Sequence, residues 1–297
     1  MNSFTEGLQY IFKTSDEHVA IDFSKAIQVI PLPNETMEAC ERFSADEFKY
    51  IKDLGGENGS ARLLKGSKTG DLVVLKTYEA FGDPLTGEVI DHSDRLDQLR
   101  HEGAAFLISS VLPLVKVPPT ILRVLPPSTL KSWGIPLGYH SDMPMNFQAV
   151  MLQQYISNVT ELSSIRQSLP DITTPETVFG LLLFDYLIAN QEGRSRNLLV
   201  QGETLLAIDH GKSFGLPTGI RNTEGLGIPD GYTLESTESL SKMFNNESAQ
   251  TLAPALQILL GKNKTNAFMV RFDKLRTILS AHVTLTVGEL KSAIIAH

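Results

Sequence analysis

The stretch that most constrains this chain spans residues 184–214 and reads FDYLIANQEGRSRNLLVQGETLLAIDHGKSF. Two short apolar runs, the first beginning at Asn197 and the second ending at Ile208, flank the turn sequence Gln201-Gly202-Glu203. This pattern predicts a β-hairpin with the glycine at its turn. Asn197 and Asp209 then stand at the two outer ends of one hairpin, where their side-chain oxygen atoms suit a hard cation such as Mg²⁺.

A further carboxylate, Glu192, precedes Asn197 by five residues, in a polar segment that follows an apolar helix pattern. A carboxylate, an amide and a second carboxylate in this order are the layout of a phosphoryl-transfer site, where metal ligands lie beside a group that orients the acceptor hydroxyl. We therefore expect Glu192 and Asp209 to be catalytic, and Asn197 and Asp209 to bind the metal ion.

Composition narrows the class of protein. The 297 residues accommodate one large core or two lobes, and 42% hydrophobic and 20% charged residues are typical of a globular protein. The formal net charge of −8 disfavours nucleic acid as the main partner, because nucleic acid favours a basic surface.

Cys40 is the only cysteine, which excludes an intramolecular disulfide and agrees with a reducing, cytoplasmic environment. We expect no signal peptide and no membrane span, since the longest apolar stretch, residues 178–189, is too short for one.

Upstream, residues 51–78 read IKDLGGENGSARLLKGSKTGDLVVLKTY and predict a hairpin topped by a glycine-rich loop that includes Gly59 and Ser60. Alternation along the last strand places Lys76 on an apolar face, which is costly unless an anion pairs with it. We interpret Gly59, Ser60 and Lys76 as phosphate-binding, because backbone amides and a cation suit phosphate groups. The alternatives are an exposed lysine near a strand end and an ordinary turn serine.

A predicted helix over residues 96–110 supplies an anion for this lysine. Leu96, Leu99 and Phe106 recur on one helix face, and Glu102 lies close to that face. We expect a buried Glu102 to pair with Lys76; the alternative is a solvated surface carboxylate.

The order of the remaining patterns divides the chain. Strand patterns prevail up to Tyr155 and helical patterns beyond it, so we predict an accessory segment at 1–45, a β-rich lobe at 46–155 and a mainly helical lobe at 156–297. Strands are predicted at 120–124 and 148–156, and we expect Gln153 and Tyr155 to contact a nucleotide at the hinge between the lobes.

Helix signals also fix several segments of the helical part. Thr174 is a plausible N-cap and Pro175 suits the first helical position of a helix that runs to about residue 189. The other predicted helices lie at 36–48, 160–169, 237–245, 249–260, 267–281 and 287–296, whereas 133–146 reads as a loop.

Taken together, these motifs resemble the atypical kinase superfamily that includes HipA-like kinases and phosphatidylinositol 3-/4-kinases. The resemblance lies in VVLK with Lys76, HEGAAFL with Glu102, the segment from Phe184 to Val200, and LLAIDHGKSF with Asp209, and it covers roughly residues 50–215. The HipA-like branch is the most similar. A Walker A motif is absent, which excludes a P-loop NTPase.

The resemblance implies an α+β, bilobal protein-kinase-like fold with a β-rich N-lobe and a mainly helical C-lobe. It implies ATP and Mg²⁺ as cofactors, Asn197 and Asp209 as metal ligands, and Lys76 as the phosphate contact. It further implies a protein substrate carrying serine or threonine, an antitoxin-like regulatory partner, and Ser60 as a phosphorylated residue of the glycine-rich loop.

One position departs from the pattern of the superfamily. Glu192 stands where the superfamily has its catalytic Asp, and Gly193 follows it where Arg is common. Glutamate keeps the charge and extends the reach by about 1.5 Å. We favour a working protein kinase, and keep as alternatives a degenerate kinase that binds nucleotide or a partner, and a phosphoinositide kinase. The lipid alternative is weaker because the sequence has no amphipathic membrane-binding segment.

Overall fold

The computed structural model describes residues 11–13, 18–20, 30, 32–55, 61–77, 81–82, 89–90, 93–125, 127–135, 148–191, 195–215, 219–220 and 223–296. Three residues predicted for the site, Gly59, Ser60 and Glu192, lie outside this described part.

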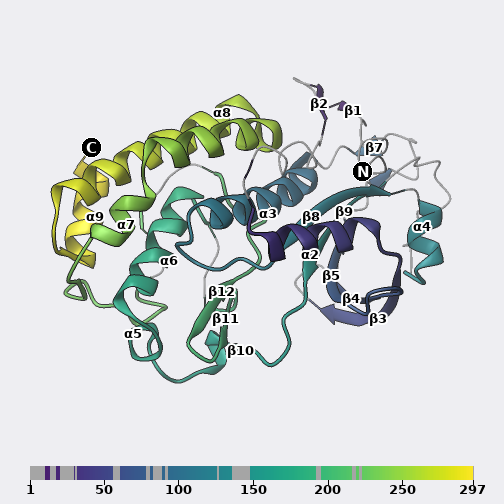
Figure 1. The fold of residues 1–297 in the computed structure, drawn as a ribbon, viewed down its shortest axis with the longest axis horizontal. Coiled ribbons are helices and arrows are strands. Elements are labelled where there is room, and N and C mark those ends of the chain that lie inside the picture. Colours follow the sequence, from purple (N-terminus) through teal and green to yellow (C-terminus); the bar gives the residue numbers. More distant parts are fainter. Residues whose placement is uncertain are drawn as a thin grey trace.

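A five-stranded antiparallel sheet, in the order β3-β4-β5-β9-β8, forms the first half of the molecule (Figure 1). Its strands are β3 (Phe48–Gly55), β4 (Ala61–Gly66), β5 (Leu72–Thr77), β8 (Thr120–Leu125) and β9 (Gln148–Gln154). The helices of this half are α2 (Asn34–Ala45), α3 (Ser93–Val111) and α4 (Pro127–Ser132), and two short strand pairs are β1 (Ile11–Lys13) with β2 (His18–Ala20) and β6 (Phe81–Gly82) with β7 (Val89–Ile90).

The two faces of this sheet have different surroundings. On β5 the side chains of Val73 and Leu75 are fully buried, whereas Val74 and Lys76 on the opposite face are only partly buried. On the buried face, the guanidinium of Arg123 lies over the ring of Trp133. The same guanidinium donates a hydrogen bond of 3.2 Å to the carbonyl of Phe43. Because α2 and the end of α4 close this face, the face that carries Lys76 is left to face the rest of the molecule.

The second half is mainly helical. Its helices are α5 (Leu169–Ile172), α6 (Pro175–Leu187), α7 (Glu238–Met243), α8 (Asn246–Ala281) and α9 (Val287–Ala296), with one 3-10 turn, η1 (Leu162–Ser164). The short strands β10 (Thr160–Glu161), β11 (Leu198–Gln201) and β12 (Thr204–Ala207) form one sheet, and β13 (Thr233–Leu234) pairs with β14 (Leu285–Thr286). As predicted, α6 begins at Pro175 with Thr174 as N-cap, whose side chain accepts the N–H of Thr177.

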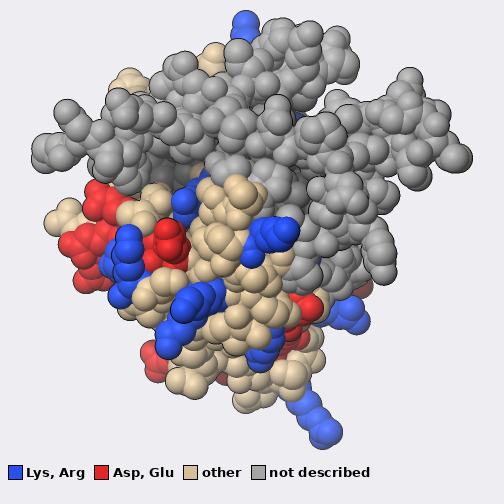
Figure 2. Space-filling model, turned by 90° about the vertical axis from the view of Figure 1, so that its right-hand side faces the viewer, with Lys and Arg blue, Asp and Glu red and all other residues tan. Residues whose placement is uncertain are grey.

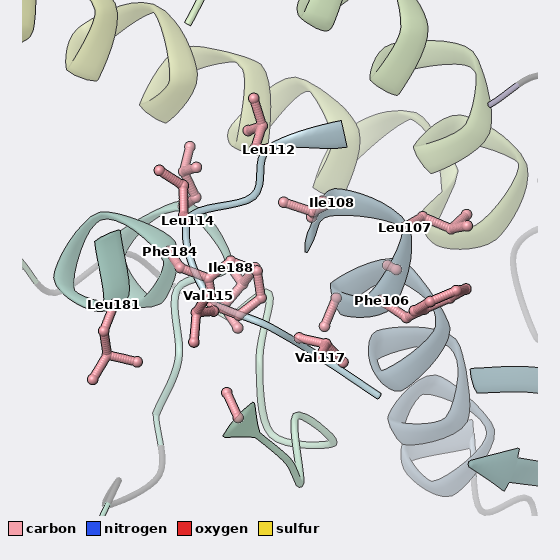
Figure 3. Close-up of a cluster of buried hydrophobic side chains, with 14 of the residues drawn as sticks. Phe106, Leu107, Ile108, Leu112, Leu114, Val115, Val117, Leu181, Phe184 and Ile188 are labelled. Carbon is pink, nitrogen blue, oxygen red and sulfur yellow. The ribbon is translucent and has the colours of Figure 1, made fainter. Parts of the chain in front are cut away.

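A shared hydrophobic core joins the two halves around α3 and α6 (Figure 3). The connection that follows α3 runs between these helices, and the labelled side chains of the cluster are Phe106, Leu107, Ile108, Leu112, Leu114, Val115, Val117, Leu181, Phe184 and Ile188. Gly180 allows the close approach, because a Cβ there would collide with the backbone carbonyl of Leu114. The connection after α3 is therefore packed closely against α6, while α3 itself packs against α8 and the sheet.

One expectation for local structure was wrong, and one short helix was missed. Residues 160–169 do not form a helix but divide between β10, η1 and the start of α5, and α4 was not predicted. The two helices expected at 249–260 and 267–281 are both present as the two parts of α8, which are separated by a kink at Gly261, where φ is 75° and ψ is 171°. Glycine tolerates this backbone conformation, so the chain changes direction without a loop.

The surface of the described residues carries mixed charge on the side next to β3 and β4. Figure 2 shows Lys and Arg side chains separated by uncharged surface on this side, with acidic side chains among them. Of the helices in the described ranges, none combines the length and the apolar composition that a membrane span requires.

Candidate functional site

Lys76 of β5 is the centre of a cluster of charged side chains drawn from three separate segments. Its ammonium nitrogen lies 2.6 Å from Oε1 of Glu102 on α3 and 2.7 Å from Oδ1 of Asp209, which follows β12. The expected pairing of Lys76 with Glu102 is thus present, and the structure adds Asp209 as a second anionic partner. Sequence separations of 26 and 133 residues show that only the tertiary fold brings the three side chains together.

Burial differs sharply within this cluster. The side chain of Glu102 is 1% exposed and that of Lys76 is 15% exposed, whereas that of Asp209 is 48% exposed. Lys76 and Glu102 thus form an interior ion pair, while about half of the Asp209 side chain remains exposed to solvent.

The protonation states follow from this arrangement. Burial by itself would lower the pKa of Lys76, but the charges of Glu102 and Asp209 outweigh burial and raise that pKa above its usual range. Burial would raise the pKa of Glu102, but the charge of Lys76 and hydrogen bonding from His210 outweigh it and lower that pKa. Both groups are therefore ionised at neutral pH.

The Asp209 turn, residues 208–211, is shaped by backbone bonds on both sides. The hairpin of β11 and β12 forms as predicted, with Gly202 at φ 60° in its two-residue turn. Beyond it, the N–H of Ile208 donates to the carbonyl of Asn197 at 3.0 Å, so Asn197 lies beside the residue that precedes Asp209. Asp209 itself has φ 58°, a left-handed conformation that Asp tolerates better than most residues.

The donor set at the end of this hairpin fits a hard divalent cation. Asp209 supplies a half-exposed carboxylate, and the amide of Asn197 is the neighbouring oxygen donor expected from the sequence. Within the described ranges, no group of three or more His, Cys, Asp or Glu side chains could hold a metal. Two protein ligands agree with Mg²⁺, which is commonly held by one or two carboxylates together with substrate phosphates and water.

Gln153 and Tyr155 lie at the end of β9, next to β5. Gln153 pairs with Val74 in register, and its buried amide donates to the hydroxyl of Thr120 at 2.9 Å. The backbone N–H of Tyr155 donates to the carbonyl of Leu72 at 2.9 Å. Both residues therefore lie beside the strand that carries Lys76, and their contact with a nucleotide stays a prediction.

Gly59, Ser60 and Glu192 lie outside the described residues, so their predicted roles also stay predictions. Ala61, the first described residue after the glycine-rich stretch, pairs with Lys76 in the register of β4 and β5.

Two histidines beside the site were missed by the sequence analysis. His210 is fully buried, with its ring edge-on to Phe184 at a centroid distance of 5.7 Å, and its backbone N–H donates to Oε2 of Glu102 at 3.0 Å. His101, next to Glu102 on α3, places Nδ1 2.7 Å from the carbonyl oxygen of Gly211. Each directly adjoins a residue predicted for the site, and this adjacency was the only signal in the sequence.

The fold is similar to that of solved kinases. The Golgi casein kinase matches with a TM-score of 0.53 and 14% identity, over 89% of this chain and 76% of that chain. The same kinase with Mn and ADP bound matches with a TM-score of 0.52 and 15% identity, over 88% and 77%. The Helicobacter pylori proinflammatory kinase CtkA matches with a TM-score of 0.37 and 12% identity, over 84% and 97%, a similarity too low to support an argument. The sequence matches no protein-family model and no curated protein.

These similarities confirm the predicted class of fold, an α+β kinase-like fold, and do not distinguish a HipA-like from a phosphatidylinositol-kinase-like branch. Within that fold, Lys76, Glu102 and Asp209 meet between the sheet and the helical half. The chain therefore has a kinase-like fold.

Proposed function

We propose that the protein is an ATP-dependent kinase that uses a divalent cation. The observation that carries this proposal is the contact of Lys76 with both Glu102 and Asp209 inside a kinase-like fold. A buried ion pair of this kind is expensive to desolvate unless it is well bonded, and apolar residues would stabilise the core at least as well. A role at an anionic ligand explains why the charges are retained.

The roles of the side chains follow from their charge and exposure. Lys76 would contact the phosphates of the nucleotide, since an ammonium group neutralises them, and Glu102 would hold that ammonium group in place. Asp209 and Asn197 would hold the cation, which supplies charge neutralisation at the transferred phosphoryl group. Glu192 would orient the acceptor hydroxyl.

For the substrate we propose a serine or threonine of a protein, with Ser60 of the same chain as one candidate acceptor. The support is the resemblance of the VVLK, HEGAAFL and IDHG motifs to HipA-like kinases. Peptide mapping by mass spectrometry after incubation with ATP tests the candidate acceptor, and active protein that stays unmodified at Ser60 removes it.

A transfer assay with labelled ATP tests the proposed activity. Wild type is incubated with Mg²⁺ or Mn²⁺ and with candidate protein substrates, beside Asp209→Ala and the control Asp230→Ala. Asp230 is a suitable control because its Oδ1 also lies 2.7 Å from a lysine, Lys291, and it is more exposed. We expect Asp209→Ala to lower the rate at least about 100-fold, as the loss of a residue that stabilises transition-state charge does. The control is expected to keep the wild-type rate, and equal transfer by wild type and Asp209→Ala contradicts the proposal.

The second candidate function is a degenerate kinase that binds nucleotide or a partner without transfer. The departure at Glu192 from the usual Asp is the observation that favours it. Nucleotide binding by wild type without transfer, together with transfer by Glu192→Asp, supports this second candidate. Transfer by wild type removes it.

A further inference from the structure

Two consecutive residues of α3 bind two neighbouring groups of the Asp209 turn. Glu102 accepts the N–H of His210 at 3.0 Å, and His101 lies 2.7 Å from the carbonyl oxygen of Gly211. The helix approaches the turn closely, since a Cβ on Gly211 would lie 3.3 Å from Cβ of Gln98. The orientation of the turn is thus tied to the position of α3 by its backbone, independently of the ion pair between Lys76 and Asp209.

A third segment completes this arrangement. Lys264 of α8, three residues beyond the bend at Gly261, places its ammonium nitrogen 2.9 Å from Nε2 of His101 and 2.7 Å from Oδ2 of Asp97. Asp97 lies one turn before His101 on α3 and also accepts from Arg100 at 3.1 Å. Lys264 therefore binds both Asp97 and His101 of α3. It meets the imidazole ring of His101 at Nε2, whereas Gly211 meets the ring at Nδ1.

The chemistry of these contacts fixes the state of the imidazole. A carbonyl oxygen only accepts, so Nδ1 of His101 carries the hydrogen; an ammonium group only donates, so Nε2 carries a lone pair. His101 is therefore neutral and adopts one tautomer. Its ring links Lys264 to Gly211 by accepting a hydrogen bond at Nε2 and donating one from Nδ1. Burial, followed by the charge of Lys264, lowers the pKa of His101 to about 4, which agrees with a neutral ring at physiological pH.

We propose that Asp97, His101 and Lys264 form a clamp that couples α8 and α3 to the Asp209 turn, and that they are positioning residues for the phosphoryl transfer proposed above. None of the three forms a hydrogen bond or an ion pair with Lys76 or Asp209 in the described part of the structure. Their effect on the site passes through Gly211 and through the placement of Glu102. Since Glu102 and Asp209 both lie within 3 Å of Lys76, a shift of α3 against the turn would separate the residues of the site. Misplacement by about 1 Å commonly costs about 100-fold in rate.

Hydrogen exchange and activity together test the clamp. The variants are Lys264→Met, which keeps the aliphatic stem and removes the charge, and His101→Asn, whose amide N–H can still donate to Gly211 but which no longer meets Lys264. The matched control is Lys291→Met, because Lys291 also forms a 2.7 Å ion pair and is 28% exposed, close to the 31% of Lys264, but lies on α9. Exchange of the backbone amides in residues 208–214 is measured in all proteins without nucleotide, and kcat and KM for ATP are measured separately.

The proposal predicts exchange in residues 208–214 that is at least about 10-fold faster in Lys264→Met and in His101→Asn than in wild type, a sign of local opening, and unchanged exchange in the control. It also predicts that both variants lose about 10-fold or more in kcat/KM, that Lys264→Arg restores most of the loss, and that the double variant loses no more than either single variant. Exchange in the Lys264 variant equal to that of the control overturns the clamp. If exchange responds as predicted but wild type transfers no phosphate, the clamp is supported and the proposed kinase activity is not.

Discussion

Oε2 of Glu102 accepts the backbone N–H of His210 at 3.0 Å, while Oε1 of the same carboxylate accepts from Lys76 at 2.6 Å. One fully buried side chain therefore joins a strand of the sheet, a helix and the turn that presents Asp209. Glu102 acts as a structural junction of the site as well as the partner of a lysine. Its loss and the loss of Lys76 should consequently have different effects.

Lys76→Met leaves the buried carboxylate of Glu102 without its main counter-charge. We expect the free energy of unfolding at pH 7 to fall by about 3 kcal/mol, the usual result of removing one partner from a buried pair. The double variant Lys76→Met/Glu102→Gln should recover part of this loss, because glutamine is neutral and still accepts from His210. Urea denaturation followed by circular dichroism provides the measurement, and a double variant less stable than Lys76→Met contradicts this account.

Glu192→Gln removes the carboxylate that we expect to orient the acceptor hydroxyl, and it nearly preserves side-chain size. We expect kcat to fall about 100-fold with little change in KM for ATP, because such a residue acts in the transition state rather than in nucleotide binding. Glu192→Asp should retain activity within about 10-fold of wild type. Steady-state kinetics with labelled ATP tests both variants, and full activity of Glu192→Gln would assign the role to another residue.

The neutral, buried His101 makes stability depend on pH. Its pKa is about 4 in the folded protein against 6.5 for an unperturbed histidine, so the unfolded chain binds the proton first as the pH falls. The contribution of this group to stability is fully present above pH 6.5 and is lost between pH 6.5 and about 4, by an amount on the order of 2–3 kcal/mol. The free energy of unfolding is measured as a function of pH for wild type and His101→Asn. The difference between the two curves isolates the effect of His101, since Asp97, Glu102 and Lys264 are present in both proteins. Parallel profiles over this range would contradict a neutral His101.

Gly180→Ala tests how closely α6 packs against the connection that follows α3. In an ordinary helix this change stabilises by about 0.5–1 kcal/mol, but here the new methyl group would collide with the carbonyl of Leu114. We expect a net loss of about 2 kcal/mol in the free energy of unfolding, as for an overpacked core. Gly231→Ala is the control, because no atom lies within 4 Å of a Cβ there, and its stability should change by less than about 0.5 kcal/mol. Thermal denaturation of both variants in the same buffer shows whether the collision makes the stability change of Gly180→Ala negative.

Local signals were enough to predict several elements of the fold. The β11–β12 hairpin follows from two apolar runs around Gly202, and the start of α6 follows from Thr174 and Pro175. Both depend on turn and cap chemistry within a few residues, which a sequence displays directly. The division of the connection 160–169 between a strand, a 3-10 turn and a helix was missed, because pairing of β10 with β11 overrides a weak local preference for helix.

The sequence by itself determined the residue types of the site: a lysine on a half-buried strand, a glutamate on a helix, and an Asn and an Asp at the ends of one hairpin. The tertiary structure alone decided that Asp209 meets Lys76 across 133 residues, that His101 and Lys264 lie behind the turn, and that Gln153 is bonded to Thr120. The physical reason is that periodicity reports which face of an element is buried, whereas the partner on that face is set by how distant elements pack. Lys76, Glu102 and Asp209 could therefore be singled out from the sequence, whereas their contacts, and those of the proposed clamp, are visible only in the fold.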